Sequence, residues 1–414
     1  MDSAEREGLR QKGNGPNLRF PEFQGDWEKQ KLCDISSIVG RIGFRGYTTN
    51  DIVEKGMGAI ALSPTNIVNN QLTYDKDNTY ISMSKYEESP EIMIKRGDVI
   101  FVKTGSTVGK VAYVDKMICK TTLNPQVVVL KDIKCDNYIL SVIMSTRNFQ
   151  NKIQRITVGG AVPTLSQVAM GNIFISLPAA KEQEKISRFI SLLDERIATQ
   201  NKIIEDLKKL KSAIIENVFD DKHSERLQLD NVGSYIRGLT YSSNDVVEHG
   251  GTLVMRSNNI VNGSLLDYNN NVVFVNKQMS AEQQLQNGDI VICMANGSSS
   301  LVGKSSFYDG NCHSPITVGA FCGIYRSKEP IVKWLFQTNN YRRYIWNSLQ
   351  GGNGAIANLN GEDILNMSFS IPNAPIKDTC VKMLTSVDSA LENNMSLCAL
   401  YTLQKQHLLR QMFI

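Results

Sequence analysis

The stretch that decides the fold is residues 182–219, which read EQEKISRFISLLDERIATQNKIIEDLKKLKSAIIENVF. It contains no Pro or Gly, and its apolar residues recur with a heptad spacing that defines two seam positions. The seam residues are Ile186, Leu193, Gln200, Leu207 and Ile214 at one position, and Ile190, Ile197, Ile204, Lys211 and Val218 at the other. Eight of these ten are apolar, a pattern that predicts one long helix in need of a partner.

The partner is predicted in the same chain, 194 residues further on. The residues at that offset are Cys380, Val387, Asn394, Tyr401 and Leu408, then Leu384, Leu391, Cys398, Lys405 and Met412. This second seam is apolar at the same eight places and polar at the same two, because Gln200 maps to Asn394 and Lys211 maps to Lys405. Agreement of this kind indicates an internal duplication.

The segments before each helix repeat as well, at offsets of 191 to 194 residues. Arg96-Gly-Asp-Val-Ile100 recurs as Asn287-Gly-Asp-Ile-Val291, Val108-Gly-Lys110 as Val302-Gly-Lys304, and Gly159-Gly160 before Pro178 as Gly351-Gly352 before Pro372. The chain is therefore expected to contain two similar globular domains, each followed by one long helix.

Each domain is predicted to be mixed α/β. Short apolar runs broken by Gly, Asn and Asp indicate strands, and the clearest internal helix is Asn137–Arg155. The strand runs of the first domain are 60–62, 99–102, 111–114 and 127–130. The predicted segments are a disordered tail (1–17), a first domain (18–178), a long helix (179–220), a second domain (221–372) and a second long helix (373–414).

Connectivity predicts how the two helices pack. Each would be about 57 Å long at 1.5 Å per residue, and parallel packing would force the second domain to return the chain over that whole length. Antiparallel packing requires no return, so we expect a pseudo-two-fold dumbbell with two domains at opposite ends of an antiparallel coiled coil. Gln200 and Asn394 would then fix the register near the middle of the seam; the alternative interpretation is that the polar seam positions are merely tolerated in solvent.

Composition limits the class of protein. In 414 residues, 42% are hydrophobic and 21% charged, as in a soluble globular protein, and no apolar run is long enough to span a membrane. The cytoplasm is the expected location. Eight Cys without a CxxC pair disfavour a zinc site or a disulfide framework. A net charge of +4 neither demands nor excludes nucleic acid as a partner.

The sequence contains only incomplete versions of three catalytic or nucleotide-binding motifs. The stretch 297–305 resembles a phosphate-binding P-loop, but five residues separate its glycines, and the equivalent stretch 105–110 has three. Asp98 with Asp132 and Lys134 is the nearest approach to a nuclease site, and the second half has no counterpart of the last two. Asn124-Pro-Gln126 lacks the second proline and the aromatic residue of an adenine methyltransferase motif. No catalytic residue and no metal site is therefore predicted.

What remains are polar, basic and aromatic clusters typical of base and phosphate recognition. Arg, Asn and Ser can read base edges, whereas Lys serves mainly phosphates. Ordinary surface loops with solvated lysines are the alternative interpretation. The DNA-contact candidates are Arg41, Arg45, Lys103, Thr104, Ser106, Lys110, Arg155, Arg237, Tyr241, Arg256, Asn258, Asn296, Ser298, Lys304, Arg342, Arg343 and Asn353.

The chain resembles the specificity (S) subunit of type I restriction-modification systems over roughly residues 18–414. The resemblance rests on Leu18-Arg-Phe-Pro-Glu-Phe23 with Trp27, on the repeated Gly-Asp and Val-Gly-Lys segments, on the Gly-Gly loops, and on the two long helices, the first opening with Lys181-Glu-Gln-Glu-Lys-Ile186. The second helix departs from this opening, and the residues before Leu18 lie outside the pattern.

The resemblance implies a non-catalytic subunit that binds double-stranded DNA. Each globular domain would be a target recognition domain for one part of a split, asymmetric sequence, and the helices would act as a ruler and docking platform. Two modification subunits would bring S-adenosylmethionine and adenine methylation, and restriction subunits would bring ATP, Mg and motor-nuclease activity, so this chain would hold no cofactor. The alternatives are a stand-alone methyltransferase or nuclease, and a scaffold that binds protein.

Overall fold

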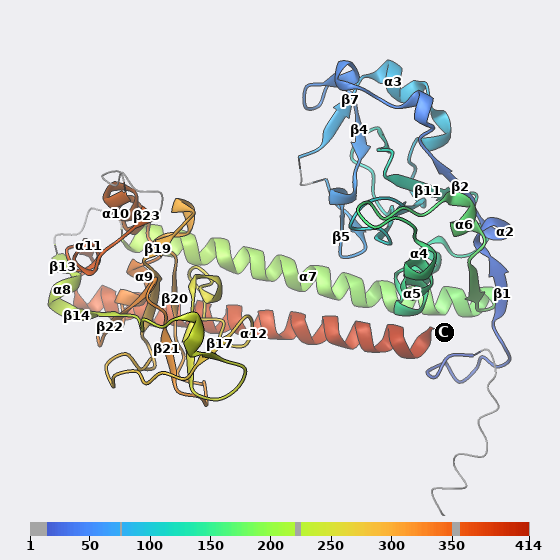
Figure 1. Ribbon diagram of the computed structural model, residues 1–414. Coiled ribbons are helices and arrows are strands. Elements are labelled where there is room, and N and C mark those ends of the chain that lie inside the picture. Colours follow the sequence, from blue (N-terminus) through green and yellow to red (C-terminus); the bar gives the residue numbers. More distant parts are fainter. Residues whose placement is uncertain (1–14, 75–76, 220–224, 350–356, 414) are drawn as a thin grey trace, which may run out of the picture. The chain divides into compact units, whose positions relative to one another are not determined.

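The computed structural model describes residues 15–74, 77–219, 225–349 and 357–413 (Figure 1). The chain forms two compact units. The first comprises the residues up to Gln200 and those from Leu397 onward, and the second comprises Asn201–Ser396. Each unit holds one globular domain and parts of two long helices, α7 (Ala180–Val218) and α12 (Ala374–Met412). This division cuts through both helices, whereas the segments predicted from the sequence keep each helix whole.

The first domain contains three sheets in its described residues. Their strands, in spatial order, are β1 (Glu28–Lys31) and β12 (Phe174–Leu177); β10 (Thr121–Leu123), β4 (Ala59–Leu62), β7 (Thr79–Ile81) and β3 (Ile52–Val53); and β2 (Ser37–Gly40), β11 (Val127–Lys131), β8 (Val99–Val102), β9 (Val111–Tyr113), β6 (Gln71–Leu72) and β5 (Ile67–Val68). The strands β4, β8, β9 and β11 confirm the four apolar runs expected to be strands.

The second domain repeats these strand orders in part, because its counterpart of the six-stranded sheet has four strands and it has an additional two-stranded sheet. Its strands are β13 (Glu225–Gln228) and β24 (Ser368–Ile371); β21 (Ile316–Val318), β16 (Thr252–Met255), β17 (Val273–Val275) and β15 (Val246–Val247); β14 (Gly233–Arg237), β22 (Cys322–Ser327), β18 (Ile290–Cys293) and β20 (Ser305–Phe307); and the pair β19 (Ala295–Asn296) and β23 (Ala357–Asn358). The sheet formed by β10, β4, β7 and β3 corresponds to the sheet formed by β21, β16, β17 and β15. Each contains one parallel pair, β10 with β4 and β21 with β16. The repeat seen in the sequence is therefore also a repeat of topology.

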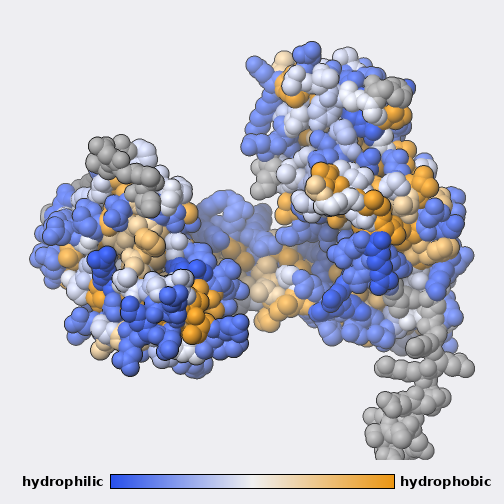
Figure 2. Space-filling model, viewed as in Figure 1, coloured by the Kyte–Doolittle hydropathy of each residue, from blue (hydrophilic) through white to orange (hydrophobic). Residues whose placement is uncertain are grey.

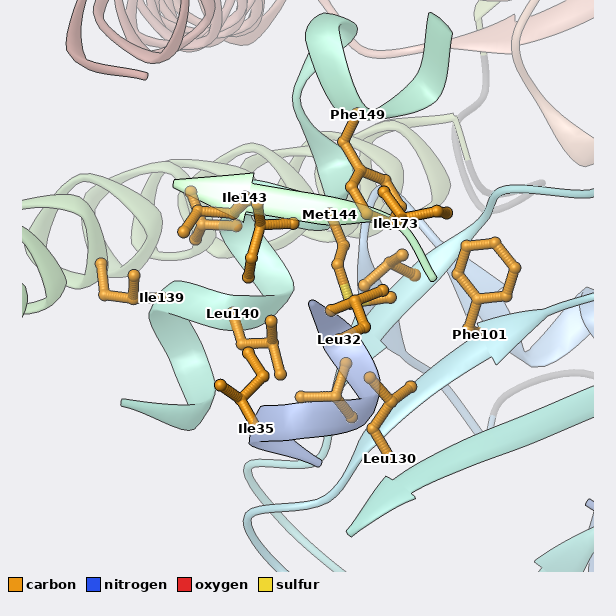
Figure 3. Close-up of a cluster of buried hydrophobic side chains, with 14 of the residues drawn as sticks. Leu32, Ile35, Phe101, Leu130, Ile139, Leu140, Ile143, Met144, Phe149 and Ile173 are labelled. Atoms are coloured by element: carbon orange, nitrogen blue, oxygen red, sulfur yellow. The ribbon is translucent and has the colours of Figure 1, made fainter. Parts of the chain in front are cut away.

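The central strands are apolar throughout because both faces of the sheet are covered. In β8, Val99 and Phe101 point into one core, and Ile100 and Val102 point into another. The first core lies against helices, and Figure 3 shows Leu32, Phe101, Leu140 and Phe149 converging in it. Alternate residues of one strand thus serve two cores, which explains a run without polar residues.

The helix expected over Asn137–Arg155 is two helices, α4 (Asn137–Ser145) and α5 (Arg147–Ile156). Thr146 between them is extended, and its side chain accepts a hydrogen bond from Phe149 N, so it caps the second helix instead of continuing the first. The second domain has α9 (Val332–Leu335) and α10 (Asn339–Leu349) at this place, and Thr338 accepts from Tyr341 N in the same way.

Shorter helices complete both domains. In the first domain these are α2 (Leu32–Ile35), α3 (Met83–Glu87) and α6 (Gln167–Gly171), and in the second α8 (Leu229–Val232) and α11 (Gly361–Leu365).

The two long helices meet in each unit through opposite ends. In the first unit, Ile186 and Ile190 near the start of α7 share a core with Met412 at the end of α12. In the second unit, Ile215 near the end of α7 shares a core with Leu384 near the start of α12. Early residues of one helix therefore pack with late residues of the other in both units.

No helix within the described ranges is long and apolar enough to cross a membrane. Figure 2 shows a mainly hydrophilic surface on which apolar side chains gather in places. Exposed apolar residues of the first domain include Val158, Val168 and Phe174.

Candidate nucleic-acid interface

The first candidate surface is the loop of residues 103–110, which connects β8 to β9. Gly105 N donates to Pro163 O over 2.9 Å, and Thr104 forms an antiparallel bridge with Thr164. These bonds hold the loop beside the segment that follows Gly159-Gly160. The loop carries four of the predicted DNA contacts, which are Lys103, Thr104, Ser106 and Lys110.

The corresponding loop of the second domain, residues 294–304, connects β18 to β20. Its strand β19 pairs with β23 as Thr104 pairs with Thr164. Asn296 Nδ2 donates to Ser257 Oγ over 3.2 Å, and Asn296 Oδ1 accepts from Ser298 N over 3.0 Å. Because Arg256 and Asn258 flank Ser257, Asn296 brings their turn next to this loop. The predicted contacts joined in this way are Arg256, Asn258, Asn296 and Ser298, with Lys304 at the end of the loop.

Backbone amides around the Val-Gly-Lys end of each loop are bonded within the protein. Lys110 N donates to Thr107 O over 3.2 Å, and Lys304 N donates to Leu301 O over 3.3 Å. Gly303 N donates to a strand carbonyl over 2.8 Å. A P-loop needs free amides to converge on one phosphate, so these turns favour contacts through side chains.

The repeated Gly-Asp segments have a structural role. Asp98 accepts from Lys95 N and lies 3.2 Å from Lys131 Nζ, and burial raises the pKa of Asp98. In the second domain Asp289 forms the equivalent pair with Arg326, at 2.6 Å. Each carboxylate ties a turn to a neighbouring strand. The described residues include no group of three His, Cys, Asp or Glu side chains placed to hold a metal ion.

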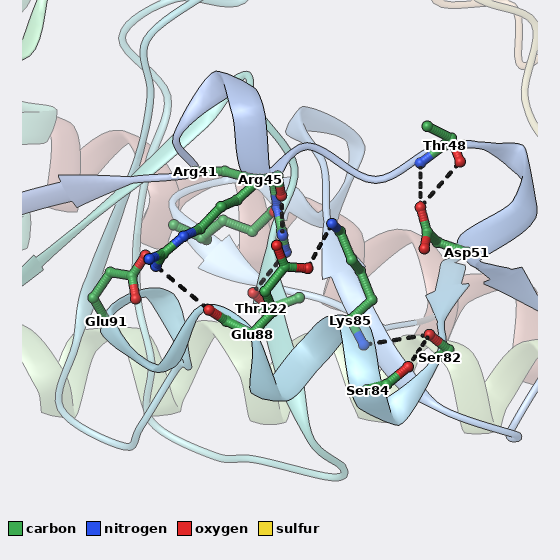
Figure 4. A network of polar contacts seen from close by, with 11 residues as sticks. Arg41, Arg45, Thr48, Asp51, Ser82, Ser84, Lys85, Glu88, Glu91 and Thr122 are labelled. Carbon is green, nitrogen blue, oxygen red and sulfur yellow. Dashed lines mark hydrogen bonds and ion pairs between the residues drawn. The ribbon is translucent and has the colours of Figure 1, made fainter.

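Arg41 is corrected from a DNA-contact candidate to a structural residue. Its side chain is 5% exposed, and Nε donates to Leu123 O over 2.8 Å while Nη2 donates to Thr122 Oγ1 over 3.1 Å (Figure 4). Burial lowers the pKa of Arg41. Its donors bond to β10, so they face the interior of the domain and not a DNA surface.

The other candidates of the first domain are accessible. Arg45, also in Figure 4, is partly exposed, with Nη1 3.6 Å from Glu91 Oε1. Arg155 is exposed on the last turn of α5. Both remain predictions, and Arg155 lies close in sequence to the Gly159-Gly160 segment beside the 103–110 loop.

Two candidates of the second domain are not joined to its loop. Arg237 is exposed at the end of β14, and Tyr241 packs in a small core with Leu239 and Val254. Among the described residues, no hydrogen bond links either side chain to residues 294–304. Asn353 lies outside the described residues.

Helix α10 completes the surface of the second domain. Tyr341 Oη donates to Gly303 O over 2.8 Å, which fixes the helix against the loop. Arg342 and Arg343 follow on the exposed side. A hollow of about 610 Å³ lies between the helix, the end of the loop and β23, and the predicted contacts Lys304 and Arg342 both line it.

Comparison with known proteins shows a family match for residues 24–209. Residues 24–209 match the family model described as Type I restriction modification DNA specificity domain. These residues are similar to a type I DNA specificity domain. The match begins before β1 and ends inside α7, so it includes the loop of residues 103–110 and most of the long helix.

Two curated relatives are type I restriction enzyme specificity subunits. Residues of this chain are 35% identical over 155 residues to the type I restriction enzyme EcoKI specificity subunit of Escherichia coli, a match covering 35% of this chain and 31% of the relative. They are 28% identical over 213 residues to the MjaVIII specificity subunit of Methanocaldococcus jannaschii, covering 49% and 43%. The matched parts thus span less than half of these relatives.

A solved structure extends the likeness of fold to the whole chain. The crystal structure of the type I restriction-modification S subunit from M. genitalium aligns with a TM-score of 0.60 at 14% identity, covering 97% of this chain and 99% of that one. The resemblance to specificity subunits is confirmed, and so is a mixed α/β fold with two domains and long helices.

The first domain is anchored on the long helices by one carboxylate. Asp194 of α7 accepts a hydrogen bond of 2.5 Å from Tyr138 Oη of α4 and forms an ion pair with Lys405 of α12. Burial raises the pKa of Tyr138, so the phenol stays protonated and donates. A single side chain therefore joins the domain and both helices.

The second domain uses the equivalent carboxylate, 194 residues further on. Asp388 of α12 lies 2.7 Å from Lys211 Nζ of α7 and 2.9 Å from Lys333 Nζ of the domain, and it accepts from Trp334 Nε1 over 3.2 Å. Burial acts to raise the pKa of Asp388, but Lys333 and Lys211 outweigh it and lower that pKa. Gln200 is 7% exposed and Asn394 is partly buried, so the interpretation that these two polar seam residues are merely tolerated in solvent is wrong for Gln200.

The sequence reasoning missed Asp194, Asp388 and Trp346. The two acids share the offset of 194 that revealed the seams, so the same comparison extended to positions beside the seam could have found them. Trp346 is 65% exposed on α10 and lines the hollow. Its nearest signal was the pair of predicted contacts Arg342 and Arg343 one turn earlier.

Proposed function

We propose that this chain is the DNA-specificity subunit of a type I restriction-modification complex, in which each globular domain reads one part of a split target. The observation that carries the proposal is the recurrence, in both domains, of the same sheet orders with a basic, polar loop at the same place. The specificity domain at residues 24–209 supplies the first copy. Side-chain contacts from such loops would read base edges and hold phosphates.

The target is asymmetric in this proposal, because the two loops differ in length and composition. The first has Lys103, Ser106 and Lys110, and the second adds Asn296 and an exposed Arg pair on α10. Two different surfaces select two different half-sites.

The long helices form an antiparallel pair that sets the spacing between the half-sites, with a pseudo-two-fold relation between the halves. The pairs Asp194–Lys405 and Asp388–Lys211 support this relation, since both members of one pair are offset by 194 residues from those of the other. A helix of 39 residues is about 58 Å long, which is the scale of the ruler.

The chain itself is non-catalytic in this proposal. Two modification subunits dock on it and bring S-adenosylmethionine for adenine methylation, and restriction subunits bring ATP and Mg for translocation and cleavage. The bonded amides of both P-loop-like turns and the structural use of Asp98 and Asp289 favour this division of labour over a self-contained enzyme.

The test is to express the chain with a modification subunit and to map methylated adenines across a genome. We expect a motif in two blocks of different sequence separated by an unread spacer. A motif in one block, or a palindrome, would contradict the proposal. Methylation by the isolated chain would favour the stand-alone enzyme.

A further inference from the structure

The hollow beside α10 is a feature of the second domain to which the proposed function assigns no ligand. We call it the α10 hollow, and its defining residues are Ser299, Lys304, Arg342, Ile345, Trp346 and Asn358. Its volume of about 610 Å³ lies within the ~300–1,000 Å³ typical of ligand pockets. It combines an apolar wall with polar and basic groups at its edge.

At the equivalent place in the first domain, a glutamine side chain packs against the loop glycine. The capping threonines Thr146 and Thr338 align α5 with α10, so Gln150 corresponds to Arg342. The Gln150 amide donates to Gly109 O over 2.8 Å and covers that glycine. In the second domain Tyr341, one residue before Arg342, donates the hydrogen bond to the matching glycine, Gly303. Arg342 makes no such bond and lines the hollow.

Trp346 is unusual among the tryptophans of this protein. The chain has three, and Trp27 and Trp334 are 3% and 2% exposed, whereas Trp346 is 65% exposed. An indole left in solvent next to a hollow is typical of a binding surface, since aromatic side chains dominate the energetics of interfaces.

Charge decides the class of ligand. Lys304 and Arg342 line the hollow, and no Asp or Glu is among its described lining residues. Neither cation forms an ion pair with another described residue. An aromatic wall with two unpaired cations fits a base attached to a phosphate, because base–aromatic stacking and phosphate pairing are then both satisfied.

We propose that the α10 hollow receives one unstacked nucleotide of the DNA target, with its base on the Trp346 ring and its phosphate at Lys304 and Arg342. This inference rests on the proposed function. In an intact duplex the base faces are covered by their neighbours, so an indole ring reaches a face only when the nucleotide leaves the stack or a base step is opened. The first domain, with Gln150 in place, reads its half-site without this step.

The experiment uses the full chain and a duplex that carries the mapped motif, with a scrambled duplex of equal length as the control. Acrylamide quenching reports mainly on Trp346, because the other two tryptophans are buried. We expect the mapped duplex to shield Trp346 from acrylamide. The variant Trp346→Phe retains a ring for stacking and is expected to lose the shielding signal while it still binds.

Affinity gives the second measurement. We expect Trp346→Ala to weaken binding of the mapped duplex about tenfold to one hundredfold, the size expected for loss of one base–aromatic stack. Phe174→Ala is the matched control, because Phe174 is an exposed aromatic residue of the first domain, 51% exposed and outside the candidate interface. Circular dichroism and the thermal midpoint confirm that each variant folds.

A base analogue locates the nucleotide. With 2-aminopurine placed in turn at each position of the second block, fluorescence is expected to rise at one position with the native chain and at none with Trp346→Ala. No rise at any position, together with unchanged affinity of Trp346→Ala, overturns the inference. Shielding of Trp346 by ATP alone also overturns it, in favour of a free nucleotide.

The two proposals fail differently. If the native chain does not prefer the mapped duplex to the scrambled one, the proposed function fails. If it does prefer the mapped duplex while Trp346 stays fully accessible, the proposed function stands and the α10 hollow has no role in it.

Discussion

Asp388 is the side chain whose loss should damage the second unit most. It lies 2.7 Å from Lys211 and 2.9 Å from Lys333, and it also accepts from Trp334. Replacing it in Asp388→Ala leaves Lys211 buried without a counter-charge, because the side chains of this pair are only 9% and 7% exposed. Removing one member of a buried ion pair costs about 3–5 kcal/mol in the free energy of unfolding.

The structure supplies a matched comparison in Asp194→Ala. The Asp194–Lys405 pair occupies the equivalent place, but its side chains are 23% and 21% exposed, so water can solvate the lysine that remains. We expect a loss of about 1–2 kcal/mol there, between the values for exposed and buried pairs. Lys333 is 28% exposed and can also reach water, so Asp388→Ala should fall in the lower half of its range.

The assay is urea unfolding followed by fluorescence. Trp334 contacts Asp388 and reports on the second unit, whereas Trp27 lies in the core of the first unit and reports on Asp194→Ala. Trp346→Phe in the background removes the exposed tryptophan from the signal. Because the chain has two units, unfolding need not be a single two-state transition. We therefore compare the urea midpoint of each unit between the native chain and the variants, in place of a global free energy of unfolding. Equal losses for the two variants, or less than about 1 kcal/mol for Asp388→Ala, would refute the argument from burial.

Four further predictions follow from named residues. The pKa of Asp388 is lowered on folding, so its contribution to stability is present above the unfolded pKa of about 3.9 and is lost as the pH falls through the folded pKa. In an acid titration, the stability of Asp388→Asn should therefore depend less on pH below pH ~4 than the stability of the native chain. Changing Lys103 and Lys110 to Ala should weaken or alter only one block of the methylated motif, whereas equal relaxation of both blocks would contradict separate reading. Inserting one helical turn near Gln200, with a matching turn in α12, should lengthen the spacer by about one to two base pairs. The reason is that a helical turn adds about 5.4 Å, whereas a base pair spans about 3.4 Å. An unchanged motif would show that the helices do not set the spacing. Arg41→Ala should lower the thermal midpoint of the specificity domain without changing the bases read, and a changed motif at native stability would restore Arg41 as a DNA contact.

Heptad periodicity predicted the long helices well because it is a local property of the chain. The seam of α7 could be read without knowledge of its partner, and the offset of 194 then located α12. The break at Thr146 was missed, although threonine is a common capping residue, since the apolar spacing continues across it into α5.

The candidate interface was harder to predict because it depends on burial, which the sequence does not state. Arg41 and Arg45 look alike in sequence, yet the guanidinium of Arg41 bonds to β10 inside the domain, whereas Arg45 stays partly exposed. The link between the Arg256 turn and the 294–304 loop depends on one hydrogen bond, from Asn296 to Ser257, between residues 39 apart. The exposure of Trp346 likewise depends on which face α10 turns to the core.

The anchoring carboxylates explain how a helix pair can hold a reading domain in a fixed orientation. A helix seam alone resists sliding of one helix along the other, but it does not stop a domain from turning about the helices. Asp194 accepts a hydrogen bond from Tyr138 of its domain and forms an ion pair with Lys405 of α12. Asp388 forms ion pairs with Lys333 of its domain and with Lys211 of α7. In each unit the group that fixes helix register therefore also contacts the domain, so a change in register would disturb the contact that orients the domain. If the helices act as the proposed ruler, spacing and orientation are coupled through one carboxylate per unit.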